Sequence, residues 1–289
     1  MRSDALAVTA AARLGEAPLW DAAAARLMWV DLLAGTVHAY DPARDRDESV
    51  AVDGPVAALA LLDGPGYLAA AGHEVGTLTW PDAVFTHIAT VHGGVRTNDG
   101  GVDPAGRFLI GTMSDEASDP GGAALFRVER GGARLVLDGA TISNGLDWSP
   151  DGSVLYYVDT PLERVDAFDY DVGTGAVTNR RVFADLSAVP GRPDGLCVDA
   201  DGGVWVAMAR GGAAVRRFDP SGSADHVVEL PVPHATSVAF GGDSLRDLYV
   251  TTSQLRMTDA DLEQWPLAGA LFRVDSVGVR GREPHRYVR

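Results

Sequence analysis

The sequence predicts an all-β protein, a six-bladed β-propeller with a metal site in its central channel. Apolar runs rich in β-branched and aromatic residues recur about every 40 to 50 residues, which is the spacing of propeller blades. The chain has 34 Gly and 16 Pro, which suit many short strands joined by tight turns. The one helical signal is a short turn near residues 258–265.

Six similar units cover nearly the whole chain, and we expect residues 1–289 to form one domain. Each unit has an apolar run followed by a run in which apolar and polar residues alternate, as in a β-meander. The first runs are RLMWVD (26–31), GYLAAA (66–71), RFLIGTM (107–113), SVLYYVD (153–159), GVWVAMA (203–209) and DLYVTTS (247–253). A β-sandwich with insertions is the alternative, but a closed propeller leaves no long sheet edge exposed.

Charge and residue types exclude several classes of function. The formal net charge is -16, so we expect neither a nucleic-acid nor a membrane partner, both of which favour a basic surface. All 24 basic residues are arginine, which excludes Schiff-base and P-loop lysines. The single cysteine, Cys197, excludes an intrachain disulfide and fits a cytoplasmic protein. The oligomeric state is not indicated by the sequence.

Four motifs place an oxygen-bearing side chain at the same distance before a turn. Five residues back from the start of each turn, this position holds Glu16, Asn98, Asn144 and Asp194. The innermost strands of a propeller line its channel, so we expect the four side chains to converge near the axis. Two carboxylates and two amides form a hard oxygen set that suits Ca²⁺, Mg²⁺ or Mn²⁺.

The alternative interpretation is that these residues only form turns or begin strands. Asn144 precedes Gly145, and Asn-Gly is the strongest short hairpin signal. Asp194 also precedes a glycine. Glu16 favours a site, because Glu is a poor turn residue and here precedes Ala-Pro.

A set of longer motifs occurs in a fixed order: LGEAPLWD, RTNDGGVDPAGRFLIGTM, ISNGLDWSPDG with LYYVDT, and RPDGLCVDADGGVWVAM. They span roughly residues 14 to 210, and LYVTTS and GALFRV extend the match more loosely. As a set they resemble the SMP-30/gluconolactonase/luciferin-regenerating-enzyme family. The resemblance implies a six-bladed propeller with one catalytic divalent metal. Members of the family include lactonases for aldonolactones, and some hydrolyse organophosphates.

The resemblance also implies roles for individual residues. The positions that match the family's metal ligands are Glu16, Asn144 and Asp194. The positions that match its sugar contacts are Arg96, Asn98 and Glu116. The stretch SDEASDP that follows Met113 matches the start of a loop over the site.

We therefore expect hydrolysis of a small-molecule sugar lactone, such as a glucono- or pentonolactone, to the aldonic acid. Ca²⁺ is the expected cofactor, and the same ligands accept Zn²⁺, Mn²⁺, Fe²⁺ or Mg²⁺. The metal would polarise the carbonyl and activate water, with Asp194 as general base. Two alternatives stay open: a promiscuous esterase or phosphotriesterase on the same metal, and a non-catalytic calcium-binding propeller.

Overall fold

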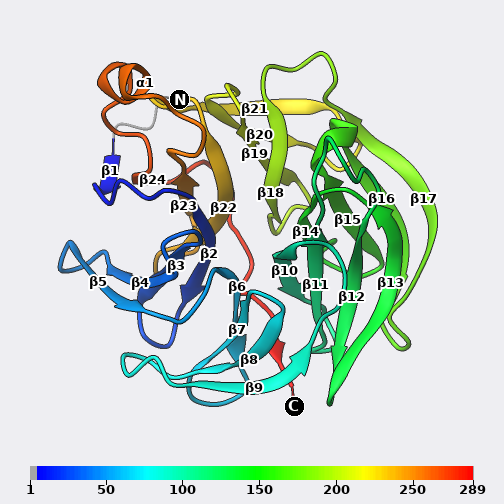
Figure 1. The fold of residues 1–289 in the computed structure, drawn as a ribbon. Coiled ribbons are helices and arrows are strands. Elements are labelled where there is room, and N and C mark those ends of the chain that lie inside the picture. The colour runs from blue at the N-terminus through cyan, green and yellow to red at the C-terminus, as the bar shows by residue number, and fades with distance from the viewer. Residues whose placement is uncertain (1–4, 289) are drawn as a thin grey trace.

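Six antiparallel sheets surround a central channel in the computed structural model, which describes residues 5–288 (Figure 1). Each sheet is one blade, and the six innermost strands contact one another in a closed ring. The innermost strands are β2 (Gly15–Asp21), β6 (Val56–Leu62), β10 (Arg96–Val102), β14 (Ser143–Trp148), β18 (Arg192–Val198) and β22 (Ala235–Gly241). The predicted six-bladed β-propeller is confirmed.

Three further strands complete each blade. The second strands are β3 (Arg26–Asp31), β7 (Tyr67–Ala71), β11 (Phe108–Met113), β15 (Val154–Asp159), β19 (Val204–Ala209) and β23 (Asp247–Thr252). The third strands are β4 (Thr36–Asp41), β8 (Glu74–Leu78), β12 (Ala123–Glu129), β16 (Arg164–Asp171), β20 (Ala214–Phe218) and β24 (Leu271–Val274). The outermost strands are β5 (Arg46–Ala51), β9 (Phe85–Thr90), β13 (Gly132–Ala140), β17 (Ala176–Asp185), β21 (Ala224–Glu229) and β1 (Ala5–Val8). The second strands match the six predicted apolar runs to within one residue at each end.

The two ends of the chain help to close the ring. Strand β1 pairs antiparallel with β24, so the N-terminal segment supplies the outermost strand of the last blade. Near the C-terminus, β25 (Arg286–Tyr287) runs parallel to β6, the innermost strand of the second blade. Because β1 is followed directly by β2 in the chain, its pairing with β24 ties the last blade to the first.

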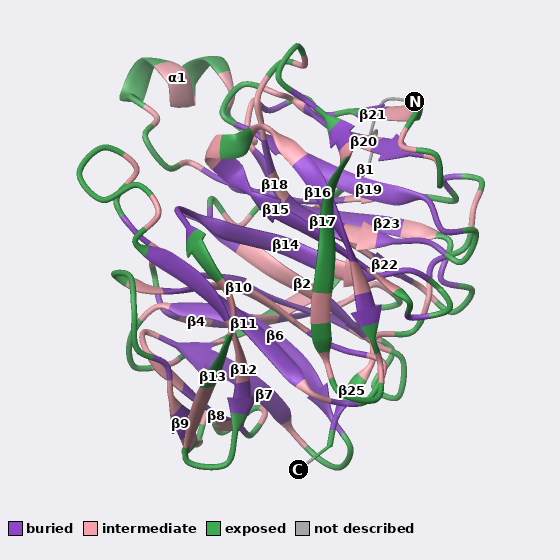
Figure 2. Ribbon diagram, turned by 90° about the vertical axis from the view of Figure 1, so that its right-hand side faces the viewer, coloured by how far each residue is buried: buried purple, intermediate pink, exposed green. Residues whose placement is uncertain are grey.

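Apolar side chains from neighbouring blades pack into shared cores. Val30 and Val37 of the first blade, for example, lie in one buried cluster with Leu59 and Leu61 of the second. Figure 2 shows the inner strands β6 and β14 mostly buried, whereas the outermost β13 and β17 are mostly half-buried or exposed. Because apolar burial is the main favourable term in folding, this packing between blades fixes the inner strands around the channel.

Helical structure is confined to short segments. The predicted turn near residues 258–265 is the helix α1 (Asp259–Gln264), which Thr258 and Asp261 cap reciprocally. A 3-10 turn, η1 (Thr160–Leu162), follows β15. Among residues 5–288, no helix is both long enough and apolar enough to cross a membrane.

All six innermost strands carry a bulge at a similar depth. In each of them the pairing with the second strand shifts register once. The residues left unpaired are, blade by blade, Ala17–Pro18, Ala57, Asn98–Asp99, Asn144–Gly145, Asp194–Gly195 and Thr236. Bulges redirect side chains, and here they turn polar groups toward the axis.

The prediction of one shared register is wrong for Glu16. In β2 the unpaired residues are Ala17 and Pro18, and Glu16 still pairs with Val30. The arm of β2 between bulge and turn has three paired residues, Leu19 to Asp21, whereas the same arm has four in β10, β14 and β18. Counting five residues back from the turn therefore reaches Glu16 in β2, although the residue at the bulge position is Ala17.

Candidate metal centre and cavity

A cavity of about 560 Å³ opens at the end of the channel where the innermost strands begin. We call this the upper end; it faces left in Figure 2, the side on which α1 lies. All six residues with a predicted site role line the cavity, namely Glu16, Arg96, Asn98, Glu116, Asn144 and Asp194. The structure thus brings together residues that are up to 178 positions apart, from Glu16 to Asp194 (194 minus 16).

Asn144 is not a turn residue. It lies within β14, it is buried, and its backbone φ is not positive, so Asn-Gly makes no hairpin here. Its amide nitrogen donates to Asp194 Oδ1 and, at 3.0 Å, to Thr160 Oγ1. The Thr160 hydroxyl in turn donates to the Pro193 carbonyl at 3.0 Å, so it can only accept from Asn144. This network fixes the amide so that its carbonyl oxygen points away from both partners.

The two glycines of these motifs allow neighbouring inner strands to approach closely. A Cβ atom on Gly145 would lie 2.4 Å from the backbone nitrogen of Leu196 in β18. A Cβ atom on Gly195 would lie 2.7 Å from Cβ of Ser237 in β22. Asn-Gly and Asp-Gly therefore serve packing around the channel, which in turn brings Asn144 and Asp194 into contact.

Glu16 and Asp194 form a buried acidic pair. Burial raises the pKa of Glu16 well above its usual value, and the charge of Asp194 raises it further. Burial also raises the pKa of Asp194 to about 7, and the charge of Asp99 adds to the rise. Both side chains keep some contact with water in the cavity, although they lie deep in the molecule. Two carboxylates so placed favour either protonation or a cation between them.

Asp99 adds a third carboxyl group beneath this pair. It occupies the bulge position that holds Gly145 in β14 and Gly195 in β18. The backbone N–H of Gly100 donates to it at 2.7 Å. Burial raises the pKa of Asp99 to about 6. The group is still mostly ionised at pH 7, and its charge raises the pKa of both Asp194 and Glu16.

Arg96 and Asn98 form a donor group on the wall beside the carboxylates. Arg96 Nη1 donates to the Thr97 carbonyl and to Asn98 Oδ1, both at 2.8 Å. The Asn98 amide nitrogen donates to the Ser143 carbonyl at 2.9 Å, which ties β10 to β14. The side-chain oxygen of Asn98 already accepts a hydrogen bond from Arg96. Asn98 therefore fits the role of a substrate contact better than that of the fourth metal ligand, which the shared register suggested.

Glu116 lines the cavity mouth and is held in ion pairs. Its carboxylate accepts from Arg210 at 2.9 Å and lies 3.8 Å from Arg192. The hydrogen bond from Arg210 lowers the pKa of Glu116. The pair joins the loop after β11 to the loop after β19, across the mouth. Glu116 is thus a charged acceptor, and part of its hydrogen-bonding capacity is already used.

Several residues that line the cavity escaped sequence reasoning. They are Thr160, Arg210, Leu255, Met257 and Trp265. Thr160 ends the LYYVDT motif, directly after a buried strand. A hydroxyl at this position could have been predicted from the sequence to contact the site. The others come from loops of the later blades, where the motifs match loosely and no residue pattern marks the approach to the axis.

The donor set fits a hard divalent cation. Two carboxylates, from Glu16 and Asp194, face the cavity together with the carbonyl oxygen of Asn144, and all are ligand types that Ca²⁺ accepts. Within residues 5–288, no group of three or more Asp, Glu, His or Cys side chains surrounds a point suited to a metal ion. A cation here would therefore depend on Asn144, and on water or substrate oxygens for the rest of its shell.

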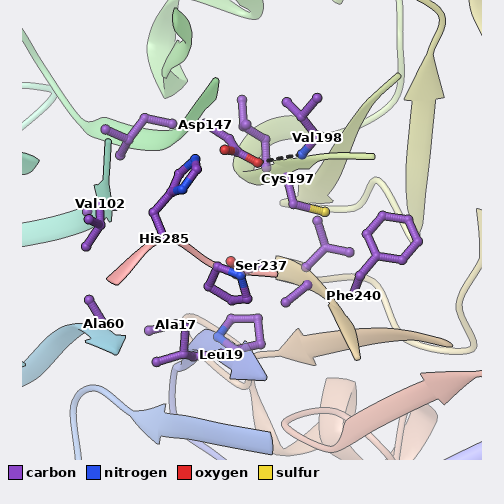
Figure 3. A pocket seen from close by; sticks show the side chains of 18 of the residues that line it. Ala17, Leu19, Ala60, Val102, Asp147, Cys197, Val198, Ser237, Phe240 and His285 are labelled. Carbon is purple, nitrogen blue, oxygen red and sulfur yellow. Dashed lines mark hydrogen bonds between the residues drawn. The ribbon is translucent and has the colours of Figure 1, made fainter. Parts of the chain in front are cut away.

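The lower end of the channel holds a smaller cavity of about 150 Å³ (Figure 3). It is lined by the later residues of all six innermost strands and by a C-terminal strap, residues 280–288. Arg282 of the strap donates to Asp147 Oδ1 at 3.0 Å and to the carbonyls of Trp148 and Val198 at 2.7 and 3.2 Å. Asp147 also accepts from the backbone N–H of Val198 at 2.7 Å, a bond drawn in Figure 3.

The strap crosses from the last blade to the second and third. Its hydrogen bonds on this path join Gly281 to Leu245, Arg280 to Ala200, Tyr287 to Asp63, Arg286 to Leu62 and Val288 to Gly106. The strap therefore closes the lower end, whereas the upper cavity stays open.

Comparison with known proteins agrees with this architecture. The sequence profile described as the SMP-30/Gluconolactonase/LRE-like region matches residues 14–254. The chain belongs to this family. Regucalcin of Pongo abelii is 38% identical over 281 residues, covering 94% of each chain.

Solved structures of family members superpose closely. A structure described as a calcium-binding protein, regucalcin, from Agrobacterium tumefaciens has a TM-score of 0.93 at 28% identity, covering 100% of this chain and 99% of that one. A luciferin-regenerating enzyme has a TM-score of 0.89 at 30% identity, covering 99% of both chains. The resemblance inferred from the sequence motifs is confirmed.

Proposed function

We propose that the protein hydrolyses a sugar lactone to the aldonic acid, with one divalent cation, Ca²⁺ in the first place, held by Glu16, Asn144 and Asp194. The observation that carries this proposal is the buried Glu16–Asp194 pair facing an open cavity, with raised pKa values and too little positive charge nearby. The family description names gluconolactonase, which supports the reaction class.

Lactone hydrolysis adds water to an ester carbonyl and breaks the ring C–O bond. When bound, the cation would act as a Lewis acid on the carbonyl and lower the pKa of nearby water. Asp194 would take the proton of the attacking water, because its Oδ1 is fixed by Asn144 while its other oxygen remains to accept. The ring oxygen leaves with a proton, and the product is the hydroxy acid.

The remaining polar residues would orient the substrate. Arg96 is anchored by Thr97 and Asn98, so its guanidinium is held in one place beside the carboxylates. Donors fixed in this way can bind a ring hydroxyl or the carbonyl oxygen without reorganising during the reaction. Glu116, fixed by Arg210, would accept from a hydroxyl at the outer side of the ring.

The test is removal and return of the metal. The protein is stripped with a chelator, and acid release from glucono-δ-lactone and a pentonolactone is followed before and after adding Ca²⁺, Mn²⁺, Zn²⁺ or Mg²⁺ one at a time. We expect activity to disappear and to return with a metal. Calcium binding by calorimetry with no lactone hydrolysed under any metal would contradict the proposal and indicate a binding protein instead. Full activity in chelator would contradict the metal requirement.

A further inference from the structure

The upper cavity has an apolar wall opposite its charged floor. Leu255, Met257 and Trp265 line the cavity from the segment that leads into and out of α1. Leu14 and Ile142, which directly precede the inner strands β2 and β14, and Met113, at the end of the second strand β11, also line it. Arg256 and Asp261 of the segment around α1 also line the cavity, but none of the proposed metal ligands lies on it.

Leu255 is unusually exposed for a leucine that lines a cavity. Its exposed fraction is 43%, and it faces the space that a ligand would fill. A single exposed leucine needs no explanation, but here Met257 and Trp265 line the same cavity from the same segment. A contiguous apolar patch inside a cavity usually marks a surface that a ligand covers.

The segment that carries these side chains is firmly anchored. The backbone N–H groups of Leu255 and Met257 donate to Ser253 Oγ at 2.8 Å and to the Gln254 carbonyl at 3.0 Å. The Gln254 side chain donates to the Ala268 carbonyl at 3.0 Å. Met257 and Trp265 also pack against the buried core of the last two blades. The wall is thus preformed, and little ordering is needed before it binds a ligand.

A compact sugar lactone does not match this wall. Each ring hydroxyl that loses water needs a hydrogen-bond partner, and the side chains of Leu255 and Met257 offer none of useful strength. The proposed metal ligands and Arg96 instead lie on the floor, where the reacting ring would lie. The volume of about 560 Å³ falls in the range of pockets for ligands larger than one sugar ring.

We propose that the cavity accepts lactones with an alkyl or aryl substituent on the ring, and that the substituent lies against Leu255, Met257 and Trp265. This proposal rests on the proposed lactonase function, because the reacting ring must lie on the polar floor. It extends that function from sugar lactones to lactones with one apolar arm. Rates should rise about fourfold for each methylene that the wall covers.

The experiment uses a series of γ-lactones with growing side chains: butyrolactone, hexalactone, octalactone and decalactone, beside glucono-δ-lactone. For each protein, the readout is kcat/KM of octalactone divided by that of butyrolactone. The variants are Leu255→Asn and Met257→Gln. The matched control is Leu135→Asn, which changes a leucine that is 50% exposed on the outermost strand β13.

We expect the ratio to be of order a hundredfold in the native protein and in Leu135→Asn, since octalactone has four more carbons than butyrolactone. We expect it to fall by about tenfold in Leu255→Asn and Met257→Gln. A flat series in the native protein, or a ratio unchanged in both wall variants, would overturn the proposal while leaving lactonase activity intact.

Binding separates this proposal from the function on which it rests. The 5-alkyl-2-pyrrolidinones are lactams of the same shape that resist hydrolysis, and their dissociation constants can be measured by calorimetry with Ca²⁺ present. If no lactone is hydrolysed under any metal, the proposed function fails. If lactam affinity then still rises with chain length and falls in Leu255→Asn, the apolar subsite stands. If affinity is independent of chain length, the subsite fails as well.

Discussion

The same six strands form both ends of the central channel, yet the carboxylates at the two ends differ in whether the chain supplies an ion-pair partner. At the lower end, Asp147 accepts from Arg282 and from a backbone N–H, and the strap covers it. At the upper end, Glu16 and Asp194 face an open cavity, and burial raises both of their pKa values. The charge of Asp147 at the lower end is thus satisfied by hydrogen bonds from the chain itself, and this contact serves stability. The upper end is left to be satisfied by a ligand.

The largest expected effect separates the two ends by activity. Asp194→Asn removes the proposed base and a ligand, and we expect kcat/KM for a sugar lactone to fall about a thousandfold. Asp147→Asn makes the same chemical change at the lower end of the same channel, and we expect it to leave kcat/KM within about twofold at 25 °C. Steady-state rates of the two variants, each saturated with Ca²⁺, provide the measurement.

The same two variants, Asp194→Asn and Asp147→Asn, should differ in the opposite direction in their free energy of unfolding. In chelator at pH 8, Asp194→Asn removes a buried charge that has a hydrogen bond from Asn144 but no ion pair, so the free energy of unfolding should rise by about 1–3 kcal/mol. Asp147→Asn weakens a satisfied pair and should lower it. Urea unfolding of both variants measures this, and a destabilised Asp194→Asn would show that the upper end is not under electrostatic strain.

The second prediction concerns the strap. Arg282→Ala removes three hydrogen bonds and leaves Asp147 with only two backbone N–H partners and no cation, so we expect the free energy of unfolding to fall by about 3 kcal/mol with no change in kcat. The control is Arg44→Ala, which removes an exposed ion pair with Asp41 and should leave the free energy of unfolding almost unchanged. Equal effects of the two substitutions would contradict a closing role for Arg282.

The smallest effect is a pH dependence of the metal-free protein. The pKa of Asp194 is about 7 in the folded protein and about 3.9 in an unfolded chain. A raised pKa contributes stability that is present below the unfolded value and is lost as the pH rises toward 7. The stability gap between Asp194→Asn and the native protein should therefore widen from pH 5 to pH 8, by at most about 1.4 kcal/mol per pH unit.

Calcium should reverse this trend. With the cation bound, ionised Asp194 is the stable form, so the native protein should gain stability over Asp194→Asn as the pH rises. Thermal unfolding of both proteins at four pH values, with Ca²⁺ or with chelator, measures the effect. A gap that is independent of pH in chelator would contradict the raised pKa.

Much of the fold was predictable because each blade repeats one local pattern. Runs such as RLMWVD have four consecutive apolar residues at their centre, because both faces of the second strand are buried between blades, and all six runs reappear as strands. The site residues were predictable for a related reason. Polar side chains such as Asn144 interrupt buried inner strands at a fixed depth, and such interruptions are costly unless they serve a site.

Other features depend on tertiary contacts that no local pattern encodes. The offset of Glu16 arises because one arm of β2 is a residue shorter, which only the pairing with β3 shows. The ion pair between Glu116 and Arg210 joins loops of two separate blades. The strap is similar: the sequence around Arg282 has no strand pattern, and its partners lie more than 80 residues away.

The most direct test of the central claim is a calorimetric titration of chelator-stripped protein with Ca²⁺. We predict one binding site per chain in the native protein and in Asp147→Asn, and its loss in Glu16→Gln, which keeps the size of the side chain but removes its charge. Absence of calcium binding in the native protein, or undiminished binding in Glu16→Gln, would contradict the claim that the upper end of the channel is a cation site.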